Sequence, residues 1–109
     1  MNRNEYNGWT NYETWVVKLW MDNDAANDSY YREQAQSVYD EAKATQTFSR
    51  ADVATIAFAD FIRVEHEERQ SKLMPDAGVF TDLLNAAMTE VDWHEIAAHY
   101  IDDGLEEAK

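Results

Sequence analysis

Two histidines near the end of the chain, His94 and His99, flank the acid Glu95 and form the pattern most suggestive of chemistry. The zinc-protease pattern His-Glu-x-x-His needs its histidines four residues apart, so that both lie on one face of a helix. Here they are five residues apart, which places them ~140° apart around a helix, so they do not readily bind one ion together. Glu95 and His99 are four residues apart and are expected to pair with each other. We therefore predict no metal site on this segment.

The third histidine, His66, lies among three acids, Glu65, Glu67 and Glu68. Consecutive residues of a helix point in different directions, so this run alone forms no cage for a cation. A charged helix end is the simpler interpretation, and we expect His66 and its neighbours to project into solvent. The sequence has no Glu-x-x-His pair, no glycine-rich phosphate loop and no cysteine. It therefore predicts a protein that is not an enzyme, with no catalytic residue, no metal and no cofactor.

The chain is strongly acidic, with 22 aspartates and glutamates against 9 lysines and arginines and a formal net charge of −13. Residues 73–108 contain no lysine or arginine, so their carboxylates have no counter-charge within the segment. A surface of this kind repels nucleic acids and anionic membranes and attracts basic proteins. Solubility, or adaptation to high salt, explains the same composition without a partner, and these alternatives stay open.

The spacing of the last acids indicates a more specific role for the charge. Asp102 and Glu106, like Asp103 and Glu107, are four residues apart, which places their carboxylates roughly 6 Å apart if a helix continues there. Phosphates along one DNA strand are separated by a similar distance, so an acidic helix face can imitate a nucleic-acid backbone. We therefore predict an acidic binding face here and a second acidic patch around position 66. The candidate residues are Asp92, Glu95, Asp102, Asp103, Glu106 and Glu107 for the face, and Glu65, Glu67 and Glu68 for the patch.

These residues must be positioned by helices, the first of which is expected over residues 11–22. Thr10 and Glu13 have the spacing of a capping box, which predicts the start of this helix. A broad apolar face follows at helical spacing, and we expect it to anchor the core. Its members are Tyr12, Trp15, Val16, Leu19 and Trp20. The acids after it, Asp22, Asp24 and Asp28, are interpreted as cap and turn residues.

Four more helices are expected from apolar residues at helical spacing. They span residues 29–44, 50–71, 79–89, and 92 to just before Gly104, which leaves 105–109 as a frayed tail. The third begins at the cap Ser49, and the fifth begins with the cap-box spacing of Asp92 and Glu95. The fourth is expected to face inward with Phe80, Leu83, Leu84, Ala87 and Met88. The sequence thus predicts an all-α, compact bundle of about five helices, a single domain over residues 1–109 with an N-terminal lead of residues 1–9.

A tryptophan-rich motif, Gly-Trp-Thr-Asn-Tyr-Glu-Thr-Trp, occupies residues 8–15 and is followed by Leu-Trp-x-Asp-Asn at residues 19–23. With Val-Asp-Trp-His-Glu-Ile-Ala at residues 91–97, it resembles a family of small, uncharacterised proteins of phages, plasmids and prokaryotic genomes. The motif is long and rich in tryptophan, so chance agreement is a poor explanation. The resemblance implies a mobile-element setting and transfers no catalytic residues.

Charge and resemblance together predict an acidic inhibitor that imitates nucleic acid and binds a basic nucleic-acid-binding protein. The natural targets in that setting are host defence machines, such as restriction enzymes or CRISPR effector complexes. The alternative is a small non-enzymatic adaptor or structural protein that binds through apolar surface. That surface would include Trp9, Tyr6, Tyr30 and any tryptophan that the core leaves uncovered.

Partners and location follow from the same composition. We expect no direct binding of nucleic acid and no membrane association, because the net charge is negative and no apolar run approaches the ~18 residues of a membrane span. A domain this small with four tryptophans can expose an apolar patch, so a homodimer is a further possibility. The lack of cysteine fits the cytoplasm of a prokaryotic host.

Overall fold

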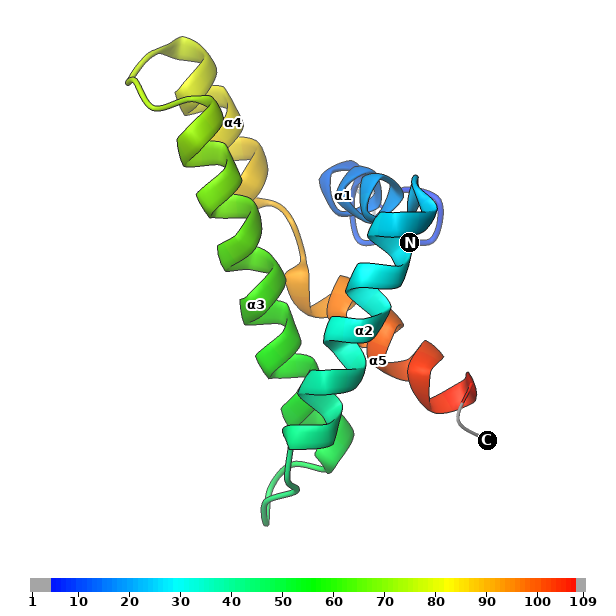
Figure 1. Ribbon diagram of the computed structural model, residues 1–109. Coiled ribbons are helices and arrows are strands. Elements are labelled where there is room, and N and C mark those ends of the chain that lie inside the picture. The colour runs from blue at the N-terminus through cyan, green and yellow to red at the C-terminus, as the bar shows by residue number, and fades with distance from the viewer. Residues whose placement is uncertain (1–4, 108–109) are drawn as a thin grey trace.

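Five helices form the protein in a computed structural model that describes residues 5–107 (Figure 1). They are α1 (Tyr12–Asp22), α2 (Ala25–Glu41), α3 (Arg50–Leu73), α4 (Val79–Thr89) and α5 (Trp93–Glu107). The described residues form no strand beyond an isolated bridge between Tyr6 and Trp9. The prediction of an all-α, single-domain bundle is confirmed. Residues 1–4 of the expected lead and 108–109 of the expected tail lie outside the described residues.

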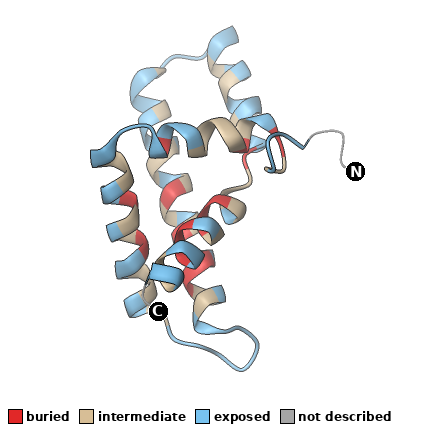
Figure 2. Cartoon of the chain, turned by 90° about the vertical axis from the view of Figure 1, so that its right-hand side faces the viewer, coloured by how far each residue is buried: buried red, intermediate tan, exposed pale blue. Residues whose placement is uncertain are grey.

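The core lies where α2 and α5 pack against α3. Phe58 of α3 is fully buried, and its ring meets that of Tyr100 of α5 edge-on, with centroids 5.8 Å apart. Tyr31 of α2 is enclosed beside them, with its ring centroid 6.1 Å from that of Tyr100. Figure 2 shows the buried residues on the facing sides of the helices and the exposed residues outside. None of the helices in residues 5–107 is long and apolar enough to cross a bilayer.

The face of α1 that enters the core is not the predicted one. Trp20 is 63% exposed and Leu19 is 41% exposed, whereas the buried residues of the helix are Thr14 and Met21. α1 packs on α2 and α5 from one side only, across the end of the bundle (Figure 1). It therefore buries the narrow line through Thr14, Val17 and Met21 and leaves the wider aromatic face outside.

Helix boundaries also differ from the predictions, most of all at the start of α2 and the end of α5. α2 begins at Ala25, four residues earlier than expected, because the Asp24 side chain accepts hydrogen bonds from two N–H groups of its first turn. α5 continues through Gly104 to Glu107, where a stop and a frayed tail were predicted. Leu105 packs against the core, and this contact outweighs the ~1 kcal/mol that glycine costs inside a helix.

The start of α1 is capped by Asn11 and not by the predicted Thr10. The Asn11 carbonyl oxygen accepts hydrogen bonds from the Thr14 N–H at 2.9 Å and from the Thr14 hydroxyl at 2.6 Å. Its amide nitrogen donates to the Glu90 carbonyl at 2.7 Å. An asparagine side chain has both an acceptor and a donor, so one buried residue caps α1 and joins it to the segment before α5.

Further hydrogen bonds extend this link. The Asp92 N–H donates to the Thr14 hydroxyl at 2.8 Å, and the Thr10 N–H donates to the Glu95 carboxylate at 3.0 Å. Asp92 also caps α5 as predicted, by accepting from the Glu95 N–H at 3.0 Å. These two hydrogen bonds join residues that are 78 and 85 positions apart in the chain. They thus hold the start of α1 against the start of α5. We call this set the α1–α5 clasp, and it comprises Thr10, Asn11, Thr14, Glu90, Asp92 and Glu95.

α4 lies beside the second half of α3, and the two form a hairpin that projects from the bundle (Figures 1 and 2). A hydrogen bond joins the side chains of Gln70 and Asn85. None of the eleven residues of α4 is buried, although Phe80 and Leu83 were predicted to face inward. Phe80 is 71% exposed and Leu83 is 62% exposed. The prediction was wrong because α4 contacts α3 only loosely, and this contact buries none of its residues. We call residues 63–90 the α3–α4 arm.

Replacing Asn11 with alanine should lower the free energy of unfolding by about 2 kcal/mol, because it removes a helix cap and leaves buried groups of Thr14 and Glu90 without partners. Urea unfolding followed by tryptophan fluorescence measures this change. Asn11→Asp keeps the capping acceptor but sets a carboxylate oxygen against the Glu90 carbonyl, so it should also destabilise the fold. A loss below about 0.5 kcal/mol for Asn11→Ala would show that the clasp contributes little.

Candidate protein-interaction surfaces

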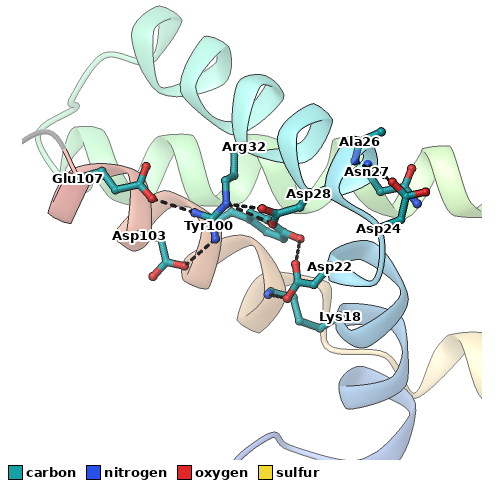
Figure 3. A network of polar contacts seen from close by, with 10 residues as sticks. All are labelled: Lys18, Asp22, Asp24, Ala26, Asn27, Asp28, Arg32, Tyr100, Asp103 and Glu107. Carbon is teal, nitrogen blue, oxygen red and sulfur yellow. Dashed lines mark hydrogen bonds and ion pairs between the residues drawn. The ribbon is translucent and has the colours of Figure 1, made fainter.

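Arg32 of α2 lies among acids contributed by two helices (Figure 3). Its guanidinium nitrogens lie 3.0 Å from the Asp28 carboxylate, 3.3 Å from that of Glu107 and 3.8 Å from that of Asp103. The hydrogen bond that it donates to Asp28 raises the pKa of Arg32, so the guanidinium stays charged. One cation therefore joins the start of α2 to the last turns of α5.

The end of α5 has more negative charge than Arg32 neutralises. Two further acids, Asp102 and Glu106, lie in the same last turns, and Asp102 is exposed. Because α5 is helical to Glu107, the condition for the predicted four-residue spacing of carboxylates is met. The electric field of exposed carboxylates extends into solvent by about a Debye length, ~8 Å at physiological salt. We call this surface the C-terminal acidic face, and it comprises Asp28, Asp102, Asp103, Glu106 and Glu107 with Arg32.

Tyr100 connects the core to Asp22 beside this face (Figure 3). Its hydroxyl donates to the Asp22 carboxylate at 2.5 Å, and Lys18 pairs with the same acid. Burial, and then the bond to Asp22, raise the pKa of Tyr100, so its phenol remains a donor. Asp24 is a helix cap, as predicted for this acidic group, whereas Asp22 and Asp28 bind side chains.

Asp92 and Glu95, two of the predicted members of the acidic face, belong to the α1–α5 clasp. The Asp92 carboxylate accepts a hydrogen bond from the Glu95 N–H, and the Glu95 carboxylate accepts one from the Thr10 N–H. Both acids lie at the start of α5, the opposite end of the helix from the C-terminal acidic face. Among the hydrogen bonds and ion pairs of residues 5–107, none joins Glu95 to His99, so their predicted pair is wrong. His99 instead lies against Trp9, with ring centroids 4.2 Å apart.

The predicted second patch is largely occupied by contacts within the chain. Glu65 accepts a hydrogen bond from the Tyr31 hydroxyl at 2.5 Å. Glu67 pairs with Arg63 at 2.8 Å. Glu68 is exposed and makes no ion pair with any other described residue. The structure therefore provides less free charge here than the sequence suggested.

His66 turns inward, contrary to the prediction that it projects into solvent. Its ring centroid lies 5.2 Å from that of Trp93 and 6.4 Å from that of Tyr31. Its Nδ1 lies 2.7 Å from the Ile62 carbonyl oxygen. Burial lowers the pKa of His66. Helices α2 and α5 cover this side of α3. The charged residues next to His66 in the sequence do not indicate that these helices lie against it.

Sequence analysis did not include Asp28 and Arg32 among the binding residues. Their four-residue spacing on α2 predicts the ion pair between them, but their approach to α5 depends on helix packing. A cavity of about 90 Å³ lies between the two helices, well below the ~300 Å³ at which ligand pockets begin. Within residues 5–107, no three His, Asp or Glu side chains converge as metal ligands.

A second candidate surface is apolar. Four large side chains near the tip of the α3–α4 arm are between 62% and 80% exposed, and we call them the α4 outer face: Leu73, Val79, Phe80 and Leu83. Trp20 of α1, at 63%, is the tryptophan that the core leaves most exposed in the residues described. Tyr6 and Tyr30 are partly exposed, whereas Trp9 packs against the core and is less available than predicted.

Stability should fall as the pH drops below about 6.5, because His66 has a lowered pKa when folded and its protonation then favours the unfolded chain. The contribution of neutral His66 to the free energy of unfolding is complete when the pH is above the pKa of this histidine in the unfolded chain. It is lost progressively at lower pH, by up to about 1 kcal/mol per pH unit. Urea unfolding at pH 7.5 and 5.5 measures this decline. His66→Gln should show a smaller decline than the wild type. His94→Gln, which removes an exposed imidazole, is the matched control. Equal declines in the wild type and His66→Gln would contradict the prediction.

Comparison with known proteins was made along the whole chain. The model of a family described as a family of unknown function (DUF7249) matches residues 2–107. No curated protein and no solved structure matches the chain. Inference about its function therefore depends on its own surfaces.

Proposed function

The chain belongs to DUF7249, a family of unknown function, and we propose that it is a small, non-enzymatic protein that presents its C-terminal acidic face to a basic, nucleic-acid-binding protein. The observation that supports this most strongly is the position of Arg32. Arg32 forms ion pairs with three of the five carboxylates of this face, those of Asp28, Asp103 and Glu107. The six residues of the face, five acids and one base, have a formal net charge of −4.

The form of the face favours a partner that binds nucleic acid. α5 is continuous to Glu107, so its carboxylates stand on a helical frame at roughly 6 Å intervals, similar to phosphates along a strand. Arg32 ties two of them to α2, which limits their movement. A groove lined by lysine and arginine would bind such a fixed row of charge more tightly than a mobile one, because less conformational entropy is lost on binding.

The proposed setting is the cytoplasm of a prokaryotic host, where the protein would be encoded by a phage or plasmid. This rests on the resemblance of the motif at residues 8–15 to mobile-element proteins. Host defence machines that hold nucleic acid, such as restriction enzymes or CRISPR effector complexes, are the natural targets. In this proposal the protein occupies their nucleic-acid groove and binds no nucleic acid itself.

A second candidate function is that of an adaptor or structural interaction protein that binds through apolar surface, and the exposed α4 outer face and Trp20 favour it. The two functions respond differently to salt. Binding by the acidic face should weaken steeply between low and moderate ionic strength, because screening reduces the attraction of exposed charges. Apolar docking should change little over the same range.

Reversal of the four α5 charges should abolish capture of nucleic-acid-binding proteins from a host lysate. The variant replaces acids near the helix C-terminus with lysine, which favours the helix dipole, so circular dichroism should show unchanged helicity. The four positions are Asp102, Asp103, Glu106 and Glu107. The measurement is a pull-down eluted in salt steps, identified by mass spectrometry, and repeated with duplex DNA as competitor, which should displace the same proteins.

The matched control changes the net charge equally at four exposed acids elsewhere, and it should retain capture. These positions are Glu41, Asp76, Asp82 and Glu90. Equal capture by the wild type and the α5 variant would exclude the acidic face as the binding site. Equal loss in both variants would show that total charge matters and not the face.

A further inference from the structure

α4 is apolar over more of its circumference than α3 covers. Leu84 and Met88 are partly buried, and Met88 lines the groove between α4 and the side chains of α3. Val79, Phe80 and Leu83 lie roughly 100° further round the helix and are exposed. A helix with two apolar sides is ordinarily packed on both. The second side of α4 therefore lacks a partner within the described chain.

The tip of the arm is electrically neutral, unlike the rest of this acidic protein. Residues 69–89 contain two bases and two acids, Arg69, Lys72, Asp76 and Asp82. None of these four forms an ion pair with another described residue. Two copies with a net charge of −13 each repel one another almost everywhere else, so this neutral, apolar tip is where they can approach.

The position of the arm supports the same conclusion. In Figure 1 the tip of the arm and the C-terminal end of α5 lie at opposite ends of the molecule. Contact through the arms therefore keeps the C-terminal acidic faces of two copies far apart. Repulsion between them, which falls off with distance and is screened within about 8 Å at physiological salt, is then small.

The size of the exposed patch is also appropriate for association. The four side chains of the α4 outer face expose on the order of 500 Å², at the upper end of what a monomer shows in one patch. A standard interface buries about 800 Å² on each partner. Two hairpins packed side by side supply the remainder from the polar atoms around the patch, as in a four-helix bundle.

We propose that the occupant of the α4 outer face is a second copy of this chain, so that two α3–α4 arms pair about a two-fold axis into a four-helix bundle. A two-fold contact places the same apolar patch on both sides and needs no oppositely charged partner. Arg69 and Lys72 of one arm then meet Asp76 and Asp82 of the other at the rim. The inference does not depend on the acidic-face proposal, and it gives the apolar surface one definite partner.

Sedimentation equilibrium of the full chain between about 1 μM and 1 mM tests the pairing. The expected result is a concentration-dependent shift from 12.7 kDa to twice that mass. Added salt should strengthen the dimer, because it screens the repulsion between the acidic copies. Salt has the opposite effect on binding by the acidic face, so failure of one proposal is distinguishable from failure of the other.

Leu83→Glu should weaken dimerisation at least 100-fold and leave helicity and thermal stability unchanged, because this side chain is 62% exposed in the monomer and lies outside the core. Trp20→Glu, at an equally exposed apolar residue of α1, is the matched control and should leave the dimer intact. The chain has no cysteine, so Leu83→Cys should form a disulfide-linked dimer on mild oxidation and Trp20→Cys should not. A monomer at every concentration, or a dimer broken by Trp20→Glu and not by Leu83→Glu, would overturn the proposal.

Discussion

The fold depends on the α1–α5 clasp, a polar contact between two helix starts that are far apart in the chain. α1 buries little apolar surface, because one of its two tryptophans, Trp20, is 63% exposed and its buried residues are only Thr14 and Met21. The position of the helix is therefore set by hydrogen bonds through Asn11 and Thr14 to the segment that begins α5. Buried hydrogen bonds of this kind contribute modestly when made and cost more when one partner is lost, so they specify a single arrangement.

The clasp also explains why the two ends of α5 differ in role. Carboxylates at its start, on Asp92 and Glu95, satisfy N–H groups of the clasp and are unavailable to a partner. Carboxylates at its end gather near one guanidinium, Arg32, and keep an excess of negative charge. Like charges four residues apart destabilise a helix, and packing of Leu105 against the core offsets this in the last turn.

α4 lies outside the core. α2, α3 and α5 supply most of the buried residues, and α1 closes one end, so no apolar cover remains for the outer side of the arm. The molecule thus has two unlike surfaces at opposite ends, one strongly acidic and one neutral and apolar (Figure 1). In the two proposals, charge would govern the encounter with a partner at the first surface, and buried area would govern affinity at the second.

The sequence by itself determined the helices and the charge. Helical spacing and caps are local properties, so the cap at Ser49, the bounds of α4 and the excess of acid were all predicted without a structure. Only the tertiary structure decided which side of each helix is covered. It buried His66, exposed Phe80, engaged Glu95 in the clasp and brought Arg32 to the acids of α5. The physical reason is that periodicity shows that a helix has an apolar side, whereas burial and ion pairing depend on which other helix lies against it.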